Sequence, residues 1–171
     1  MKNELLRTLI AFPVLGGMLM LQSAIISHIK LMQGCADVVL LTLIAWIIQE
    51  PVRTAWQWGL IAGLMVSLLS ALPFPVLLMA YLAVTGIALI FKRIFFERPL
   101  LAMLAASLAG TLVLHAITVG VLRIMGTPIP LGESFNRVTL PSQMLNLLLT
   151  IPIYALLSDL SAWLHPSKIQ I

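Results

Sequence analysis

The sequence predicts an all-α, polytopic membrane protein with six transmembrane helices and with both termini in the cytoplasm. Three observations predict this fold: the composition, the length of the apolar stretches and the uneven placement of Lys and Arg. Of the 171 residues, 61% are hydrophobic and 9% are charged, and the mean hydropathy is +1.09. An average soluble domain has roughly a quarter of its residues charged. The composition therefore excludes an ordinary water-soluble domain.

The apolar stretches are long enough for membrane helices. About 20 apolar residues are needed for a span, because a rise of about 1.5 Å per residue must cross roughly 30 Å of hydrocarbon. Six stretches approach this length, and we expect them to form one integral membrane domain. They lie at about 8–29, 36–49, 54–72, 74–91, 99–122 and 143–164.

The ends of these stretches differ in the signals that define them. The first is longer than a signal-peptide core, so we expect a retained helix. The second is short and ends at "QEP", so it either begins earlier or does not span fully. The third and fourth meet at "LPFP", where two prolines forbid a continuous helix. The stretch "GTPIPLGESFNRVTLP" carries three prolines and two glycines, which predicts an exposed loop before the sixth helix.

The placement of Lys and Arg predicts the orientation, because positively charged loops stay in the cytoplasm. With six spans, one side of the membrane receives seven of these residues and the other receives three. The seven are Lys2, Arg7, Arg53, Lys92, Arg93, Arg98 and Lys168, and the three are Lys30, Arg123 and Arg137. The side with seven is expected to be cytoplasmic. The net charge of +4 then reflects topology, and we expect no nucleic-acid partner.

The sequence offers little chemistry. It contains no phosphate-binding glycine loop, no H-E-x-x-H, no G-x-S-x-G and no carboxylate pair at helical spacing within one span. Cys35 has no second cysteine to pair with. We therefore expect no enzyme activity, no catalytic or metal-binding residues and no cofactor.

Single ionisable groups in or near the membrane are the remaining candidates, because a charge in lipid costs a few kcal/mol or more. Asp37 opens the second helix, where a carboxylate caps free amides and interacts favourably with the helix dipole. Capping and a specific recognition role are both open for it. His115 lies deep in the fifth helix, and a neutral imidazole bonded to a neighbouring helix explains it without proton transport.

Small and polar residues recur at every fourth position in three helices. Such spacing keeps side chains near one face, and small residues let membrane helices approach closely. The stripes either pack inside the bundle or meet a partner protein. The third helix carries Gly59, Gly63, Ser67 and Ala71, the fifth carries Ala102, Ala106 and Gly110, and the sixth carries the polar set Ser142, Asn146, Thr150, Tyr154 and Ser158.

The segment "GLIAGLMVSLLSALPFPVLLMAYLAVTGIALIFKR" resembles the rod shape-determining MreD family, as do "GCADVVLLTLIAW" before it and "LNLLLTIPIYALL" near the end. Ala36 departs from the family's proline before the aspartate, and Ser67 stands where the family often has an acid. The matching positions are Asp37, Gly59, Gly63, Leu64, Tyr81 and Gly86.

The resemblance implies a non-enzymatic inner-membrane component of the bacterial cell-elongation machinery that supports peptidoglycan synthesis. The implied partners are an MreC-like protein with one membrane helix, the glycosyltransferase RodA, a class B penicillin-binding protein and the MreB cytoskeleton, in addition to membrane lipid. An alternative from another class is the substrate-binding S-component of an energy-coupling-factor vitamin transporter, which also has six helices with small-residue faces. Such a protein needs polar groups that converge on an outward cavity.

Overall fold

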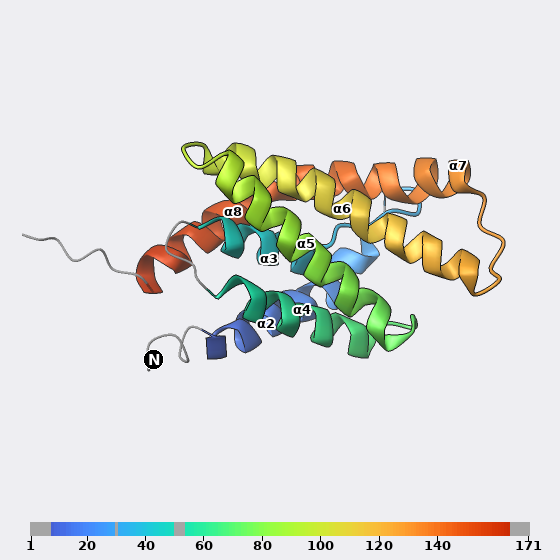
Figure 1. The fold of residues 1–171 in the computed structure, drawn as a ribbon, viewed down its shortest axis with the longest axis horizontal. Coiled ribbons are helices and arrows are strands. Elements are labelled where there is room, and N and C mark those ends of the chain that lie inside the picture. Colours follow the sequence, from blue (N-terminus) through green and yellow to red (C-terminus); the bar gives the residue numbers. More distant parts are fainter. Residues whose placement is uncertain (1–7, 30, 50–53, 165–171) are drawn as a thin grey trace, which may run out of the picture.

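In lipid, backbone amides and carbonyls find no water, so an apolar chain pairs them within helices. The computed structural model describes residues 8–29, 31–49 and 54–164, and this part of the chain is all-α. Figure 1 shows its helices packed along one long axis. The longer helices are α2 (Ala11–Ala24), α3 (Val38–Ile48), α4 (Ala55–Leu69), α5 (Phe74–Ile94), α6 (Pro99–Ile124) and α8 (Leu140–Leu164), and the short turns are η1 (Ile26–His28), α7 (Leu131–Ser134) and η2 (Phe135–Thr139).

Four helical stretches are long and apolar enough to cross a membrane. They are Ala11–His28, Phe74–Ile94, Pro99–Ile124 and Leu131–Leu164, with 18, 21, 26 and 34 residues. The chain therefore has the features of a multi-pass membrane protein. The other two predicted spans are shorter helices, since α3 has 11 residues and α4 has 15.

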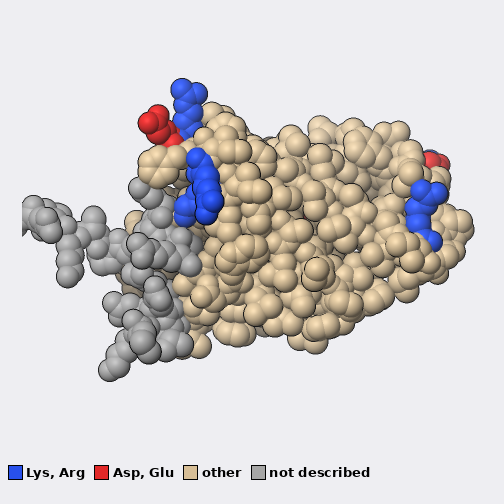
Figure 2. Space-filling view, in the orientation of Figure 1, with Lys and Arg blue, Asp and Glu red and all other residues tan. Residues whose placement is uncertain are grey.

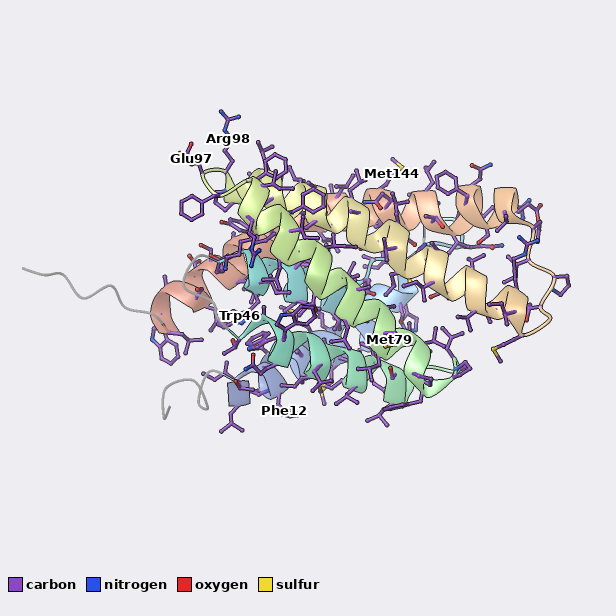
Figure 3. All side chains as sticks on the ribbon, in the orientation of Figure 1. Phe12, Trp46, Met79, Glu97, Arg98 and Met144 are labelled. Carbon is purple, nitrogen blue, oxygen red and sulfur yellow. The ribbon has the colours of Figure 1, made fainter. Side chains whose placement is uncertain are left out.

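Apolar side chains cover the surface between the two ends of the bundle. Figure 3 shows Trp46 inside the bundle, whereas Phe12, Met79 and Met144 point outward. These three outward side chains are more than half exposed. Lipid is the natural solvent for such a surface, because exposed apolar groups on this scale are unfavourable in water.

The charged side chains gather at the two ends of the long axis on the face drawn in Figure 2. Lys92, Arg93 and Arg98 lie at the turn between α5 and α6, and Arg123 and Arg137 lie near the opposite ends of α6 and α8. The other Lys and Arg residues of the predicted charge asymmetry lie outside the described residues: Lys2, Arg7, Lys30, Arg53 and Lys168.

The short helix α3 forms the centre of the molecule. All of its 11 residues are buried, and it packs against α2, α4, α5, α6 and α8. A helix that is apolar on every face belongs in the interior. Trp46 of α3 stacks on Trp58 of α4 with ring centroids 4.1 Å apart. Because α3 has no lipid-facing side, the other helices surround it as a shell.

The end of α4 follows from the "LPFP" turn. Pro73 has no amide hydrogen, and its ring would collide with the carbonyl of Leu69, four residues earlier, if the helix continued. The helix accordingly ends at Leu69, three residues before the predicted boundary. Ala71, the last position of the predicted small-residue stripe, is therefore an exposed turn residue and not part of the helix.

The predicted loop "GTPIPLGESFNRVTLP" is the largest difference from expectation. Within this stretch only residues 126–130 are non-helical, and the chain is helical from Leu131 to Leu164. The π-helical turn η2 precedes Pro141, which lies at the start of α8. Pro141 cannot donate to the carbonyl of Arg137, four residues earlier. That carbonyl instead accepts from the backbone amide of Gln33, at 3.1 Å, so the proline is accommodated without a helix break.

Candidate functional site

Asp37 is the N-cap residue of the buried helix α3. Its Oδ1 accepts a hydrogen bond from the amide of Leu40 at 2.9 Å, and the Gln22 side chain of α2 accepts from the amide of Val39 at 3.0 Å. The Tyr81 hydroxyl of α5 lies 3.0 Å and 2.9 Å from the two carboxylate oxygens. Asp37 therefore both caps α3 and attaches it to α5.

Lys92 holds the other end of α3. Its Nζ donates to the carbonyls of Ile47 at 2.9 Å and Gln49 at 2.6 Å. A cation at a helix C-terminus and an anion at the N-terminus both interact favourably with the helix dipole. Tyr81 and Lys92 both belong to α5. One helix therefore supplies the partners for both ends of the central one.

Before α3 the chain makes a tight turn at residues 31–34, where Leu31 and Gly34 exchange backbone hydrogen bonds, and continues as the extended segment 34–37, which lies on α8. The amides of Gln33, Cys35 and Asp37 donate to the Arg137 carbonyl at 3.1 Å, the Ser142 hydroxyl at 3.1 Å and the Asn146 side-chain oxygen at 2.8 Å. Cys35 and Asp37 are two residues apart, an advance of about 6.7 Å in extended chain, and their acceptors are four residues apart, an advance of about 6 Å in a helix, so these two amides match successive turns of α8. The polar stripe of α8 thus satisfies backbone that is not itself helical.

Gly34 allows this close approach. A Cβ at this position would lie 2.6 Å from the amide nitrogen of Ser142 and 2.7 Å from the carbonyl oxygen of Val138. Both are backbone atoms and cannot turn aside. Glycine is therefore required for the extended segment to reach α8.

The deeper polar residues of α8 contact α6. Asn146 donates through its side-chain nitrogen to Thr111 at 2.9 Å, and the hydroxyls of Thr150 and Ser107 lie 3.3 Å apart. Tyr154 and Ser158 line a cavity of about 440 Å³ near Gln49 and Lys92. The α8 stripe therefore faces the inside of the described chain.

The small-residue stripes also pack internally. A Cβ on Gly59 would collide with the hydroxyl of Thr85, and one on Gly63 would lie 3.1 Å from Cα of Leu78, both on α5. Ser67, one turn further along α4, is also buried, and its hydroxyl has no partner among the described residues. On α6, Ala102 and Ala106 are fully buried, and a Cβ on Gly110 would lie 3.2 Å from Val84 of α5.

His115 takes part in a second polar contact between α6 and the turn before α8. Its Nδ1 lies 3.1 Å from the hydroxyl of Thr139, so the ring does bond a neighbouring element. In the described ranges, no three His, Cys, Asp or Glu side chains are grouped closely enough to hold a metal ion. Asp159 is exposed on α8 and takes no part in the network around Asp37.

Several residues of this network carry no distinctive signal in the sequence. Lys92 has the sequence context of an ordinary cation at the membrane interface, at the end of an apolar stretch. Gln22, Ser107 and Thr111 are polar residues within apolar stretches. A helical-period test on the α6 sequence would have placed Ser107 and Thr111 on one face, four residues apart. The capture of Gln33 by α8 depends on the π-turn, which no spacing rule foresees.

Comparison with family models, curated proteins and solved structures finds no match for this chain. The resemblance to the MreD family therefore rests on the residues quoted above. The arrangement of those residues in space is an observation separate from that resemblance.

Proposed function

We propose that this protein is an MreD-like, non-enzymatic component of the bacterial cell-elongation machinery in the inner membrane. The observation that carries the proposal is that five of the six matching positions, all except Leu64, lie together in space. Asp37 bonds Tyr81, while Gly59 and Gly63 of α4 lie against α5. The α4 side chain Trp56 is the nearest neighbour of a Cβ built on Gly86, at 3.8 Å.

These residues support the proposal because each serves one interface, that of α5 with α3 and α4. A chance likeness of apolar patterns would scatter its matches over lipid-facing and internal positions alike. A shared fold explains why these residue types occur together: the glycines let α4 approach α5 closely, and the Asp37–Tyr81 hydrogen bond holds α3 beside them. Ser67 is buried one turn after Gly63 on α4, so the acid often found there in the family is replaced by a smaller polar group.

The proposed topology has six crossings with both termini in the cytoplasm. The α3 helix of 11 residues is only about 16 Å long. The chain turns tightly at residues 31–34, and the segment 34–37 then adds about 13 Å, so that it and α3 together approach the roughly 30 Å of hydrocarbon that the second crossing must span. The α4 helix, about 22 Å long, makes the third crossing together with the turn at residues 70–73. The turn between α5 and α6 then faces the cytoplasm, in agreement with its Lys and Arg.

The partner we propose is an MreC-like protein with a single membrane helix, which acts together with RodA, a class B penicillin-binding protein and the MreB cytoskeleton. The small-residue stripes of α4 and α6 are already occupied by neighbouring helices of the same chain. The partner helix therefore meets the lipid-facing surface of the shell.

Co-purification tests this function. The tagged chain is co-expressed with an MreC-like protein and, as a matched control, with the same protein carrying an unrelated membrane helix. The proposal expects the first to be retained in detergent and the second to be lost. Retention of neither, with the tagged chain folded and inserted, would contradict it.

A transporter S-component is the second candidate, and one observation favours it. A cavity of about 380 Å³ lies at the Arg137 end of the bundle and is lined by His115, Glu133 and Arg137 among others. A vitamin that stays bound after purification, together with capture of an energising subunit in place of the single-span protein, would identify this second function.

A further inference from the structure

The cavity at the Arg137 end is built by a hook in the chain. It lies between α6 and the hook formed by residues 129–139, and its volume is about 380 Å³. Val119, Leu122 and Ile129 contribute apolar wall, whereas His115, Thr118 and Thr139 contribute polar groups. This combination of mostly apolar wall and a few polar groups is typical of small-molecule sites.

The hook is defined by local chemistry. Gly126 has φ +86°, and the amides of Gly126 and Thr127 donate to the carbonyls of Arg123 and Leu122. This is the Schellman arrangement that ends a helix, and it favours glycine. Pro128 and Pro130 then keep the chain extended until α7 begins at Leu131. The chain therefore turns back along α6 without packing directly against it, which leaves the cavity between them.

The π-turn η2 supplies part of the cavity wall. Arg137, Val138 and Thr139 all belong to this turn and all line the cavity. A π-turn is rare and is frequently found at functional sites. Here it brings Thr139 to His115.

His115 presents a hydrogen-bonding atom to the cavity. Its Nδ1 is hydrogen-bonded to the hydroxyl of Thr139. Its Nε2 has no hydrogen-bond partner among the described residues and is not completely enclosed by protein atoms. Since His115 lines the cavity, Nε2 is available to a molecule that enters it.

The charged groups of the cavity compensate one another. Glu133 and Arg137 form an ion pair at 3.6 Å, and their side chains are 63% and 54% exposed. The pair lies at the solvent-exposed rim and leaves no net charge for a ligand to neutralise. A ligand bound deeper meets apolar side chains and His115.

We propose that this cavity binds a small uncharged molecule that has an apolar body and one hydrogen-bonding edge directed at His115 Nε2. The proposal does not rest on the scaffold function, because a scaffold protein and a transporter can both hold such a ligand. Indole is a suitable probe, since its rings are apolar and its single N–H donates to an unprotonated imidazole nitrogen.

Histidine acylation by diethyl pyrocarbonate, read by peptide mass spectrometry on the full chain in detergent, tests the site. The proposal expects His115 to react and indole to slow its reaction several-fold in a saturable manner. His28, which is exposed at the end of η1, is the internal control and should keep its rate. An unreactive His115, or equal slowing at both histidines, would overturn the proposal.

Filling variants provide a second arm. Val119→Trp or Thr118→Trp should protect His115 without indole and abolish any further effect of indole, while Leu112→Trp, on the lipid-facing side of α6, should behave as wild type. Indole protection that persists in both filled variants would place the ligand elsewhere and reject the site. The wild-type comparison of His115 with His28 decides the matter if either filled variant fails to fold.

Discussion

Tyr81 shows how one hydroxyl can determine the position of a buried helix. It is fully buried and donates toward both oxygens of Asp37. A carboxylate away from water is unfavourable unless its oxygens are hydrogen-bonded, and the amide of Leu40 satisfies only part of this need. Capping alone therefore does not describe Asp37, because the same side chain also joins α3 to α5.

Tyr81→Phe should lower the stability of the folded protein while it keeps the ring in place. The variant removes only the hydroxyl and leaves Asp37 with fewer donors, which costs about 1–3 kcal/mol for an unsatisfied buried group. Thermal unfolding in detergent measures the loss. Tyr154→Phe, at a half-buried ring that lines the cavity near Lys92, is the control and should melt near wild type. Equal melting of the two variants would show that the Asp37 bond contributes nothing.

Gly34→Ala should be more damaging than its single added carbon suggests. The new Cβ would lie 2.6 Å from the amide nitrogen of Ser142, so the extended segment must move away from α8 and lose hydrogen bonds worth about 1 kcal/mol each. Gly17→Ala is the matched control, because a Cβ there has no neighbour within 4 Å. Circular dichroism melts of the two variants should therefore differ, and a Gly34 variant as stable as wild type would refute the close approach.

At the scale of the elements, the sequence predicts the long helices well and the interrupted ones poorly. The predicted 74–91 and 99–122 helices correspond to α5 and α6, which each extend two or three residues further. Apolar length alone identifies such helices. The start of α8 could not be predicted in the same way, because three prolines in the "GTPIPLGESFNRVTLP" stretch indicate a loop. The π-turn and the donation from Gln33 remove the usual penalty of Pro141.

The candidate site was only partly predictable for a related reason. The recurrence of small or polar residues at every fourth position of α4 and α8 predicts that one face of each helix makes close contacts. It does not predict which element packs against that face. Asp37 stands out as an acid in an apolar segment, whereas its partner at the other end of α3, Lys92, looks like an ordinary interfacial residue. Contacts between residues more than 100 positions apart, such as Asp37 and Asn146, follow from the three-dimensional packing and not from local pattern.

Gly63→Leu tests whether the α4 stripe packs within the chain. The added side chain would push α4 away from Leu78, and overpacking of this kind costs about 1–3 kcal/mol or more. The purified variant should therefore melt at a lower temperature on its own, with no partner present. Leu68→Ala at an exposed site of α4, where the side chain is 74% exposed, should change little. Normal melting of the Gly63 variant would mean that the interface with α5 is not formed.

At the scale of the whole molecule, charge and hydropathy divide the surface into two ends and an apolar band. The five described Lys and Arg residues lie at the ends, three beside the α5–α6 turn and two near the hook (Figure 2). This division sets the molecule across a bilayer. The buried α3 then starts away from both charged ends, at Asp37, with its backbone paired to α8.

The proposed orientation predicts a labelling pattern in intact cells. In a Cys35→Ser background, a membrane-impermeant thiol reagent should miss a cysteine introduced at Arg93 and should label one introduced at Ser134. Arg93 is exposed and Ser134 is partly exposed in the structure, so access to both depends on the side of the membrane. Permeabilised cells, in which both cysteines should react, are the control. The reverse pattern would contradict the orientation.

The enclosed position of α3 imposes an order on assembly. An 11-residue helix is too short to be stable as an independent span, and the segment before it exposes amides that lipid cannot satisfy. Their acceptors, Ser142 and Asn146, lie 107 and 109 residues further along the chain. The early part of the protein must therefore wait, incompletely folded, until α8 has been made. Folding of such a protein is completed only when its C-terminal helix packs, and its central helix is the last part to reach its native contacts.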